Sequence, residues 1–180
     1  MIVIISDDKK ENIGKSLYQY YKGKSQEEEV EFVSASGLDI KPCYGCEGCT
    51  YKTYGECVFR DDMDSIVPLL MEGDTIIYTS PMVWGGFSAC IKRIVDKMSL
   101  TGYRFYNYKN GELVKGTISK MTKIVGIAES DKTTENERLS FENLLKEIGN
   151  IIDVKHLGRV VASSYASTDV EKLALEVAEL

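Results

Sequence analysis

The chain has 180 residues, 43% of them hydrophobic and 28% charged, and its formal net charge is -6. This length and composition suit a single globular domain with a full hydrophobic core and exclude a disordered chain. The acidic balance argues against nucleic acid and anionic membrane surfaces as partners. The apolar opening, residues 1–5, is too short for a signal-peptide core or a membrane span, so we expect a cytoplasmic protein with reduced thiols.

Short runs rich in Val and Ile alternate with segments whose apolar residues have helical spacing, which predicts buried strands and amphipathic helices in turn. In chain order the predicted elements are strand Ile2–Ile5, helix Asn12–Tyr21, strand Val30–Val33, helix Asp62–Met71, strand Thr75–Thr79, helix Ser88–Met98, strand Lys123–Ala128, helix Glu135–Ile148, strand Leu157–Ala162 and helix Asp169–Ala178. Such repeated alternation predicts a parallel sheet with helices on both faces. No linker or internal repeat interrupts it, so we expect residues 1–180 to form one domain.

Residues 41–60 form a cysteine-rich loop between the second strand and the second helix. They hold four of the five cysteines, spaced C-x-x-C-x-x-C with a fourth after seven more residues: Cys43, Cys46, Cys49 and Cys57. In a reducing compartment this clustering favours a metal or redox site over disulfides. Four thiolates can ligate an iron–sulfur cluster, zinc also accepts four thiolates, and a third interpretation is a loop of reduced, packed or redox-sensitive thiols. The spacing leaves all three open.

Residues 103–117, YRFYNYKNGELVKGT, also fall outside the alternation. Asn110-Gly111 between alternating residues is typical of a tight two-residue hairpin turn. We interpret the segment as a surface excursion with aromatic packing. The alternative is a lid or a dimer contact beside the active site.

In parallel sheets of this type, ligands bind beyond the carboxyl ends of the strands, where the strand order reverses. The loops after the first, third and fourth strands are therefore the candidates. After the third strand, Gly85-Gly86 permit positive φ and a close approach of a flat ligand, and Trp84 can wall that ligand in. The alternative is an ordinary strand-to-helix turn with a tryptophan in the core.

Three stretches resemble the NAD(P)H-dependent FMN reductase family: Gly55–Met63, Asp74–Pro81, and Trp84–Ala89 followed by Lys92. Members commonly show a cysteine-rich loop, then G-x-C, D-D-M and S/T-P-x-Y-x-G-G-x-S-A-x-x-K; Val83 stands here in place of that Tyr. The resemblance is specific from Cys43 to Met98. It implies a flavodoxin-like three-layer sandwich, a five-stranded parallel sheet in the order 2-1-3-4-5, FMN at the switch point between the first and third strands, and a homodimer or homotetramer.

The loop after the first strand departs from the family pattern G-S-P-R-x-x-x-N-T, because Ser6-Asp7-Asp8-Lys9 replaces its first four residues and Ile13-Gly14 its last two. A carboxylate about 4 Å from a phosphate charge costs about 1 kcal/mol in water and about 4 kcal/mol near a protein surface. The attraction between a phosphate and a helix N-terminus contributes only about 0.3–1 kcal/mol. Aspartates that point inward would therefore weaken FMN binding. If they point to solvent, backbone amides with Lys9, Lys15 and Ser16 can hold the phosphate.

The resemblance implies three groups of FMN contacts. The phosphate group is Ser6, Lys9, Asn12, Gly14 and Ser16; the ring group is Ser80, Pro81, Met82, Val83, Trp84, Gly85, Gly86 and Phe87; the third wall runs from Gly126 to Glu129. No catalytic side chain is expected, since the flavin N5 carries the hydride chemistry.

The leading hypothesis is an FMN-dependent oxidoreductase that transfers a hydride from NAD(P)H to flavin and electrons to a small-molecule or protein acceptor. The cysteine loop also resembles iron–sulfur flavoproteins, relatives of the same fold, although their fourth cysteine usually comes sooner and Val58 replaces the Pro that follows the last ferredoxin cysteine. An electron carrier with FMN and a four-cysteine cluster is therefore the second hypothesis. The third is a non-enzymatic binding protein that has lost FMN, as Asp7-Asp8 would allow.

Overall fold

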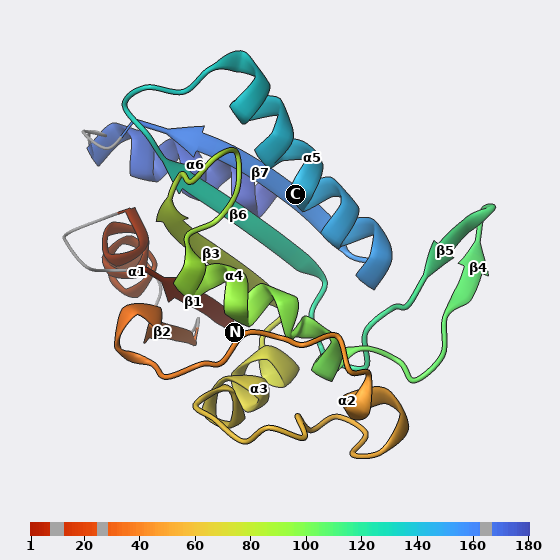
Figure 1. The fold of residues 1–180 in the computed structure, drawn as a ribbon. Coiled ribbons are helices and arrows are strands. Elements are labelled where there is room, and N and C mark those ends of the chain that lie inside the picture. Colours follow the sequence, from red (N-terminus) through yellow and green to blue (C-terminus); the bar gives the residue numbers. More distant parts are fainter. Residues whose placement is uncertain (8–12, 25–28, 163–166) are drawn as a thin grey trace.

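The computed structural model describes residues 1–7, 13–24, 29–162 and 167–180 (Figure 1). Its main sheet has five parallel strands in the order β2-β1-β3-β6-β7. These strands are β1 (Ile2–Ser6), β2 (Val30–Ser34), β3 (Thr75–Pro81), β6 (Lys123–Glu129) and β7 (Lys155–Val161). Counted along the main sheet, this is the order 2-1-3-4-5, so the predicted flavodoxin-like topology is confirmed.

Helices cover both faces of the sheet, because successive strand residues point to opposite sides. In β1, Ile2 and Ile4 pack with helices α1 (Ile13–Lys24) and α6 (Ser167–Glu179). Val3 and Ile5 pack in the other layer, under the helices α3 (Met63–Glu72), α4 (Ala89–Asp96) and α5 (Glu135–Ile152). The result is the predicted three-layer sandwich with two apolar layers, one on each side of the sheet.

The ends of the helices follow local chemistry. Helix α5 begins with a capping box, in which Thr134 Oγ1 accepts from the Glu137 N–H at 3.2 Å and the Glu137 carboxylate accepts from the Thr134 N–H at 2.9 Å. The predicted helix at 88–98 is shorter: α4 ends at Asp96, and a separate 3₁₀ turn, η2 (Met98–Thr101), follows. Two further short turns are η1 (Ala35–Gly37) and α2 (Gly48–Tyr51), which flank the first cysteines.

The predicted hairpin is confirmed as β4 (Asn107–Lys109) and β5 (Glu112–Val114), which pair antiparallel. Asn110 and Gly111 have φ values of 54° and 85°, as a two-residue turn with two left-handed positions requires. The hairpin extends away from the sheet beside the end of α5 (Figure 1), where Lys109 forms an ion pair with Asp153. None of the described helices has the length and apolar character that crossing a membrane requires.

Candidate functional site

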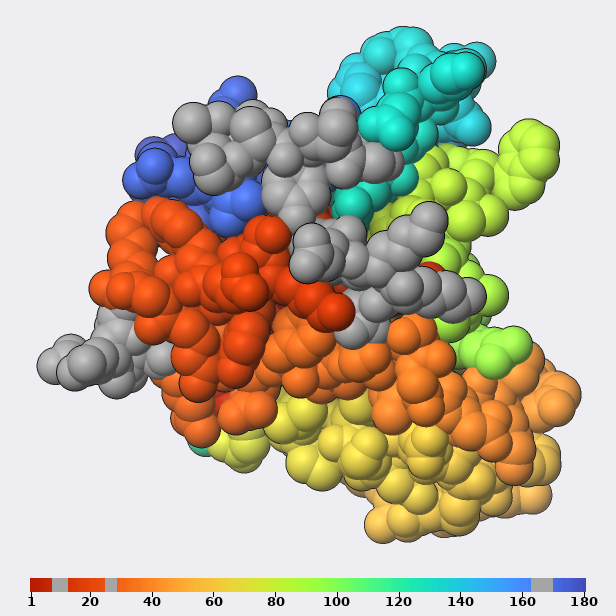
Figure 2. All heavy atoms as spheres, turned by 90° about the vertical axis from the view of Figure 1, so that its left-hand side faces the viewer, coloured from red at the N-terminus to blue at the C-terminus, as the bar shows by residue number. Residues whose placement is uncertain are grey.

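The first candidate site lies at the carboxyl ends of β1 and β3. Strand β1 lies between β2 and β3, so the chain leaves β1 to one side and later returns on the other. The loops after β1 and β3 therefore diverge, which is the switch point at which ligands bind in this topology. Figure 2 faces this edge of the sheet, with the orange-red first helix, the yellow-green loop after β3 and the cyan segment after β6 around it.

Helix α1 begins directly on these two strand ends. Gly14 makes this approach possible, because a Cβ there would lie 2.4 Å from Thr79 Oγ1 and 2.6 Å from Ser6 Oγ. Thr79 Oγ1 donates to Ser6 Oγ at 2.8 Å, and the Asp7 N–H donates to the Thr79 carbonyl at 2.9 Å. Ser6 and Gly14, both predicted beside a phosphate, are thus brought together. Ser16 follows half-buried on α1, whereas Asp8, Lys9 and Asn12 lie outside the described residues.

The loop after β3 forms a tight turn with an exposed tryptophan. Val83 and Gly86 exchange two backbone hydrogen bonds, of 3.0 and 2.9 Å, and between them Trp84 and Gly85 have φ values of 50° and 73°. Trp84 is 93% exposed, so the alternative of a tryptophan in the core is wrong. Gly85 packs on α5, where a Cβ would lie 3.0 Å from the Ser140 Cβ, while a Cβ on Gly86 would meet only the Val83 carbonyl, at 3.6 Å. Gly86 therefore leaves open space on the solvent side.

The predicted ring contacts divide into buried and accessible residues. Ser80 is fully buried, and its Oγ accepts from the Ser88 N–H at 3.2 Å. Phe87 is also buried; its ring lies 6.0 Å from that of Tyr78 and 5.0 Å from that of Phe141. The buried contacts of Ser80 and Phe87 therefore anchor the loop to the core. The residues left accessible at least in part are Pro81, Met82, Val83, Trp84 and Gly86.

Gly126 does not lie at this edge. It is within β6, and a Cβ there would lie 2.6 Å from Leu145 of α5, so its glycine serves packing between helix and sheet. The last residue of the strand, Glu129, does reach the edge. Its carbonyl accepts from the Met82 N–H at 2.9 Å, which ties the β3 loop to the end of β6. The predicted third wall is therefore supported at Glu129 and not at Gly126.

Acidic side chains also lie where α1 begins. Glu129 Oε1 accepts from the Ile13 N–H, the first residue of α1, at 3.2 Å. Burial raises the pKa of this carboxyl, and the hydrogen bond from Ile13 offsets part of that rise. Asp7 is 6% exposed, so of the two alternatives for this residue, inward or toward solvent, the one toward solvent is wrong. The helix end thus already donates a hydrogen bond to a carboxyl oxygen, and a phosphate would accept the same kind of bond.

These observations fit FMN, on one condition. The open Gly86 and exposed Trp84 leave room and an aromatic surface for a flat ring system, and the start of α1 offers backbone N–H groups for a phosphate. The condition is that Glu129 gives up the Ile13 N–H or becomes neutral. Sequence reasoning missed this contact, although a carboxylate at the end of the fourth main-sheet strand was a signal for it.

The second candidate site is the cysteine loop. Gly45 and Glu47 adopt left-handed φ values of 61° and 55°, which turn the chain tightly between the first three cysteines. Gly48 lets the returning segment pack on the loop, because a Cβ there would lie 2.6 Å from Val58 Cγ1. All four thiols consequently line one cavity of about 190 Å³; Cys43 and Cys46 are exposed, and Cys49 and Cys57 are half-buried.

The base of the hairpin also lines this cavity. Arg104, Phe105, Tyr106 and Lys115 line it together with Lys97 and Ser99, and Cys49 Sγ lies 3.6 Å from Ser99 Oγ. The two segments that interrupt the strand–helix alternation therefore meet each other. Lys97, which follows the last residue of α4, lines this cavity, so the hairpin base borders the cysteines and not the carboxyl ends of the strands. In Figure 1, α2 lies near the end of α4 that is opposite to the β3 loop.

The distances between the thiols bear differently on a single zinc ion and on an iron–sulfur cluster. Across the described ranges, no three cysteine, histidine or acidic side chains converge closely enough to hold a single ion. A mononuclear zinc site is therefore not preformed in this part of the chain. A cluster spreads its thiolates over several irons, so it needs one shared cavity and not one shared point. The cavity also carries positive charge, from Lys97, Arg104 and Lys115.

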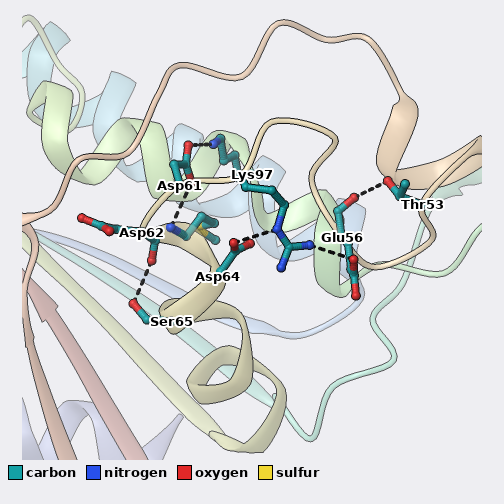
Figure 3. A network of polar contacts seen from close by, with 9 residues as sticks. Thr53, Glu56, Asp61, Asp62, Asp64, Ser65 and Lys97 are labelled. Carbon is teal, nitrogen blue, oxygen red and sulfur yellow. Dashed lines mark hydrogen bonds and ion pairs between the residues drawn. The ribbon is translucent and has the colours of Figure 1, made fainter.

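Asp61 closes the cysteine loop at its base (Figure 3). Its carboxylate accepts from the Lys41 N–H at 2.9 Å and from the Met63 N–H at 3.0 Å, and it forms an ion pair with Lys97. The side chains of Asp61 and Lys97 are 1% and 3% exposed. Burial by itself raises the pKa of Asp61, but the hydrogen bonds from Lys97, Lys41 and Met63 and the charge of Lys97 bring it below its usual value.

Comparison with known proteins gives a family and a fold. Residues 1–145 match the family model described as NADPH-dependent FMN reductase. An iron–sulfur flavoprotein of Methanocaldococcus jannaschii is 36% identical over 90 residues, which are 49% of this chain and 46% of that protein. An iron–sulfur flavoprotein of Archaeoglobus fulgidus is 42% identical over 76 residues, 42% of this chain and 34% of that protein. The alignments thus span less than half the length of these curated relatives.

Solved structures agree with the topology. The azoreductase from Bacillus anthracis str. Sterne has a TM-score of 0.65 at 12% identity, covering 99% of this chain and 94% of that one. An FMN-dependent NADH-azoreductase from Bacillus anthracis str. Ames Ancestor, in complex with FMN, has a TM-score of 0.62 at 16% identity, covering 99% and 95%. At these identities the likeness establishes the fold alone.

Proposed function

The chain belongs to the NADPH-dependent FMN reductase family, and on that basis we propose that it is an FMN-dependent oxidoreductase that takes a hydride from NAD(P)H and passes electrons to a small-molecule or protein acceptor. One observation carries the proposal. At the β1–β3 switch point, the first N–H of α1 already serves an anionic oxygen, and an open, tryptophan-bearing turn lies after the neighbouring strand.

Bound FMN would supply the hydride acceptance that no side chain of this chain provides. The protein's part is to position and to tune. The Ile13 N–H and the neighbouring start of α1 would hold the phosphate, with Ser6 and Gly14 beneath it. Main-chain groups from Met82 to Gly86 would border the ring, and the buried Phe87 and Ser80 fix that turn in place. Such a pre-formed turn loses little freedom on binding.

The test is an equilibrium titration with FMN and a rate measurement with NADH and NADPH, on protein purified without oxygen. We expect binding with quenching of flavin fluorescence and flavin-dependent oxidation of one of the two nicotinamides. A colourless protein that takes up no added FMN would contradict the proposal and favour the third hypothesis, a binding protein without flavin. The acceptor, a homodimer or homotetramer, and a cytoplasmic location stay predictions.

Replacing Gly86 with Leu is expected to weaken FMN binding at least about tenfold, or about 1.4 kcal/mol. A Cβ at Gly86 would meet only the Val83 carbonyl, at 3.6 Å, so we expect the leucine to extend into the space proposed for the ring without disturbing the fold. Gly37→Leu is the matched control, because a Cβ there has no neighbour within 4 Å and lies outside the site. Equal FMN affinity of the G86L variant and the wild type would rule out the ring position.

Replacing Glu129 with Gln is expected to tighten FMN binding at least about tenfold. A carboxylate about 4 Å from a phosphate charge costs about 4 kcal/mol near a protein surface, and Gln keeps an oxygen for the Ile13 N–H without that charge. Glu72→Gln removes the same charge from the exposed pair with Lys120 and should leave the affinity unchanged. An unchanged or weaker affinity of E129Q would show that Glu129 does not compete with the phosphate.

The same carboxyl gives a pH dependence with a defined sign. Because the pKa of Glu129 is raised in the folded protein, falling pH protonates it before an ordinary Glu, and the repulsion of a phosphate ends. FMN affinity of the wild type should therefore rise, relative to E129Q, as pH falls through that raised pKa. Its effect on folding has the same direction: stability rises as pH falls from the raised pKa toward the ordinary value of about 4.3.

A second candidate function is favoured by the cysteine cavity. Four thiols and three cationic side chains line it, and the curated relatives named above are iron–sulfur flavoproteins. We propose that Cys43, Cys46, Cys49 and Cys57 hold an iron–sulfur cluster that exchanges electrons with the flavin. Iron, acid-labile sulfide and electron paramagnetic resonance on anaerobic protein test this. Cys46→Ser should lower the iron content and Cys90→Ser, outside the cavity, should not; protein without iron and sulfide would contradict the cluster.

A further inference from the structure

Lys115 places a buried positive charge beside the cysteines. It is 8% exposed and lines the cavity, where its Nζ donates to Thr50 Oγ1 at 3.3 Å and lies 5.6 Å from the centroid of the Tyr106 ring. Within the described residues, it has no carboxylate in ion-pair distance. Lys97 in the same cavity differs in this respect, since Asp61 neutralises it. Lys115 is therefore the buried cation whose counter-charge the described chain does not supply.

The direction of Lys115 is fixed by the base of the hairpin. Its backbone N–H donates to the Ile151 carbonyl of α5 at 2.7 Å. Its side-chain stem lies across Gly102, where a Cβ would come within 3.0 Å of Cε and 3.3 Å of Cγ. Gly102 in turn pairs with Thr117 in an antiparallel bridge. The absence of a side chain at Gly102 thus lets the lysine extend to Thr50, the neighbour of Cys49 in the chain, and the lysine stays buried.

Charge balance indicates what the cavity accommodates. Burying an ammonium group without a counter-ion costs several kcal/mol, and a neutral hydroxyl at 3.3 Å with an aromatic ring offsets only part of it. The four cysteines that line the same cavity become negative when they ligate a metal centre, because the thiolate is the ligand. An anionic, thiolate-ligated group therefore supplies the charge that Lys115 lacks.

We propose that Lys115 is the charge partner of a four-cysteine iron–sulfur cluster in this cavity and raises the reduction potential of that cluster. The inference rests on the cluster proposed above. One electron from a reduced flavin would add one negative charge to the cluster beside Lys115, would leave the flavin oxidised by one electron, and would break no bond to a cysteine. A nearby ammonium favours the more negative, reduced form more than the oxidised form.

The experiment compares Lys115→Met with Lys109→Met in anaerobically reconstituted protein. Lys109 is on the same hairpin but exposed and outside the cavity, so K109M controls for the lost charge. Iron and sulfide per chain are measured first, and the cluster is then titrated with redox mediators and followed by electron paramagnetic resonance. At a fixed solution potential we expect the ratio of reduced to oxidised cluster to fall about tenfold in K115M, which is 59 mV for a one-electron couple, and to stay at the wild-type value in K109M.

The outcomes separate the two proposals. Lys115→Arg keeps the positive charge, so its ratio of reduced to oxidised cluster should stay close to the wild-type value. If Lys115 were only structural, the ratio would not depend on whether the replacement carries a charge. A loaded K115M protein with the wild-type ratio would overturn the role of Lys115 and leave the cluster standing. Wild-type protein without iron and sulfide would overturn both. If K115M does not fold, Lys115→Gln, which keeps a polar contact to Thr50 without the charge, takes its place and is judged by the same ratio.

Discussion

Replacing Asp61 with Ala is expected to destabilise the protein by about 3–5 kcal/mol, because it leaves the buried Lys97 without a counter-charge. It also removes the acceptor for the Lys41 and Met63 N–H groups, so the cysteine loop loses both of its anchors. Chemical denaturation of the variant and the wild type measures the free energy of unfolding. A loss below about 1 kcal/mol, the range of exposed ion pairs, would show that this buried network contributes little.

A matched control for Asp61 is Glu72→Ala, which breaks the exposed pair with Lys120 and should cost less than about 1 kcal/mol. A double variant, Asp61→Ala with Lys97→Met, should recover part of the lost stability, since the stranded charge is then gone. The contribution of Asp61 also has a pH signature. Because its folded-state pKa is lowered, its contribution is present above the unfolded value of about 3.9 and is lost as pH falls through the folded pKa.

Replacing Gly14 with Ala is expected to weaken FMN binding at least about tenfold and to cost about 1–3 kcal/mol of stability by overpacking. A Cβ at Gly14 would lie 2.4 Å from Thr79 Oγ1 and 2.6 Å from Ser6 Oγ, so the start of α1 must move away from the strand ends that it serves. Isothermal titration with FMN and chemical denaturation measure the two effects.

The control for Gly14 lies on the same helix. Gly23→Ala adds the same atoms where no neighbour lies within 4 Å, and it should raise helix stability by up to about 1 kcal/mol without changing FMN affinity. Adding Thr79→Ala to Gly14→Ala removes the nearest clashing atom and should restore part of the stability. A G14A protein with wild-type stability and affinity would contradict the close seating of α1 on β1 and β3.

Local pattern sufficed for the strands and helices, because strand burial and helical spacing depend on nearby residues. The strands and helices of the sandwich were all predicted, and the topology followed from the resemblance of the Cys43 to Met98 stretch to a family. The end of α4 was less predictable. Its apolar spacing continues through Met98, but the helix ends at Asp96 and a 3₁₀ turn begins at Met98. Lys97, between the two, forms the buried ion pair with Asp61.

The candidate sites were predictable only in part, because they depend on how loops face each other. The positive-φ turn at Gly85 was predictable from its glycines, whereas the exposed position of Trp84 was left open. The inward direction of Phe87 depends on Tyr78 of β3 and Phe141 of α5, two elements far apart in the chain. Glu129 acts through contact with Ile13, which lies 116 residues earlier in the chain. Nor does any spacing reveal that Lys115 faces the cysteines, since alternation in a hairpin only tells the two faces apart.

The Asp61 carboxylate accepts hydrogen bonds from the backbone N–H groups of both Lys41 and Met63, so it holds the two ends of the intervening segment together. These two ends stay at the same place whatever lies between them, and doubling the length of such a closed segment costs only about 0.6 kcal/mol of chain entropy. Insertions or deletions ahead of Cys57 can therefore accumulate without disturbing the sheet. This tolerance extends to the interval before the last thiol but not to Asp61, whose carboxylate holds both ends of the segment.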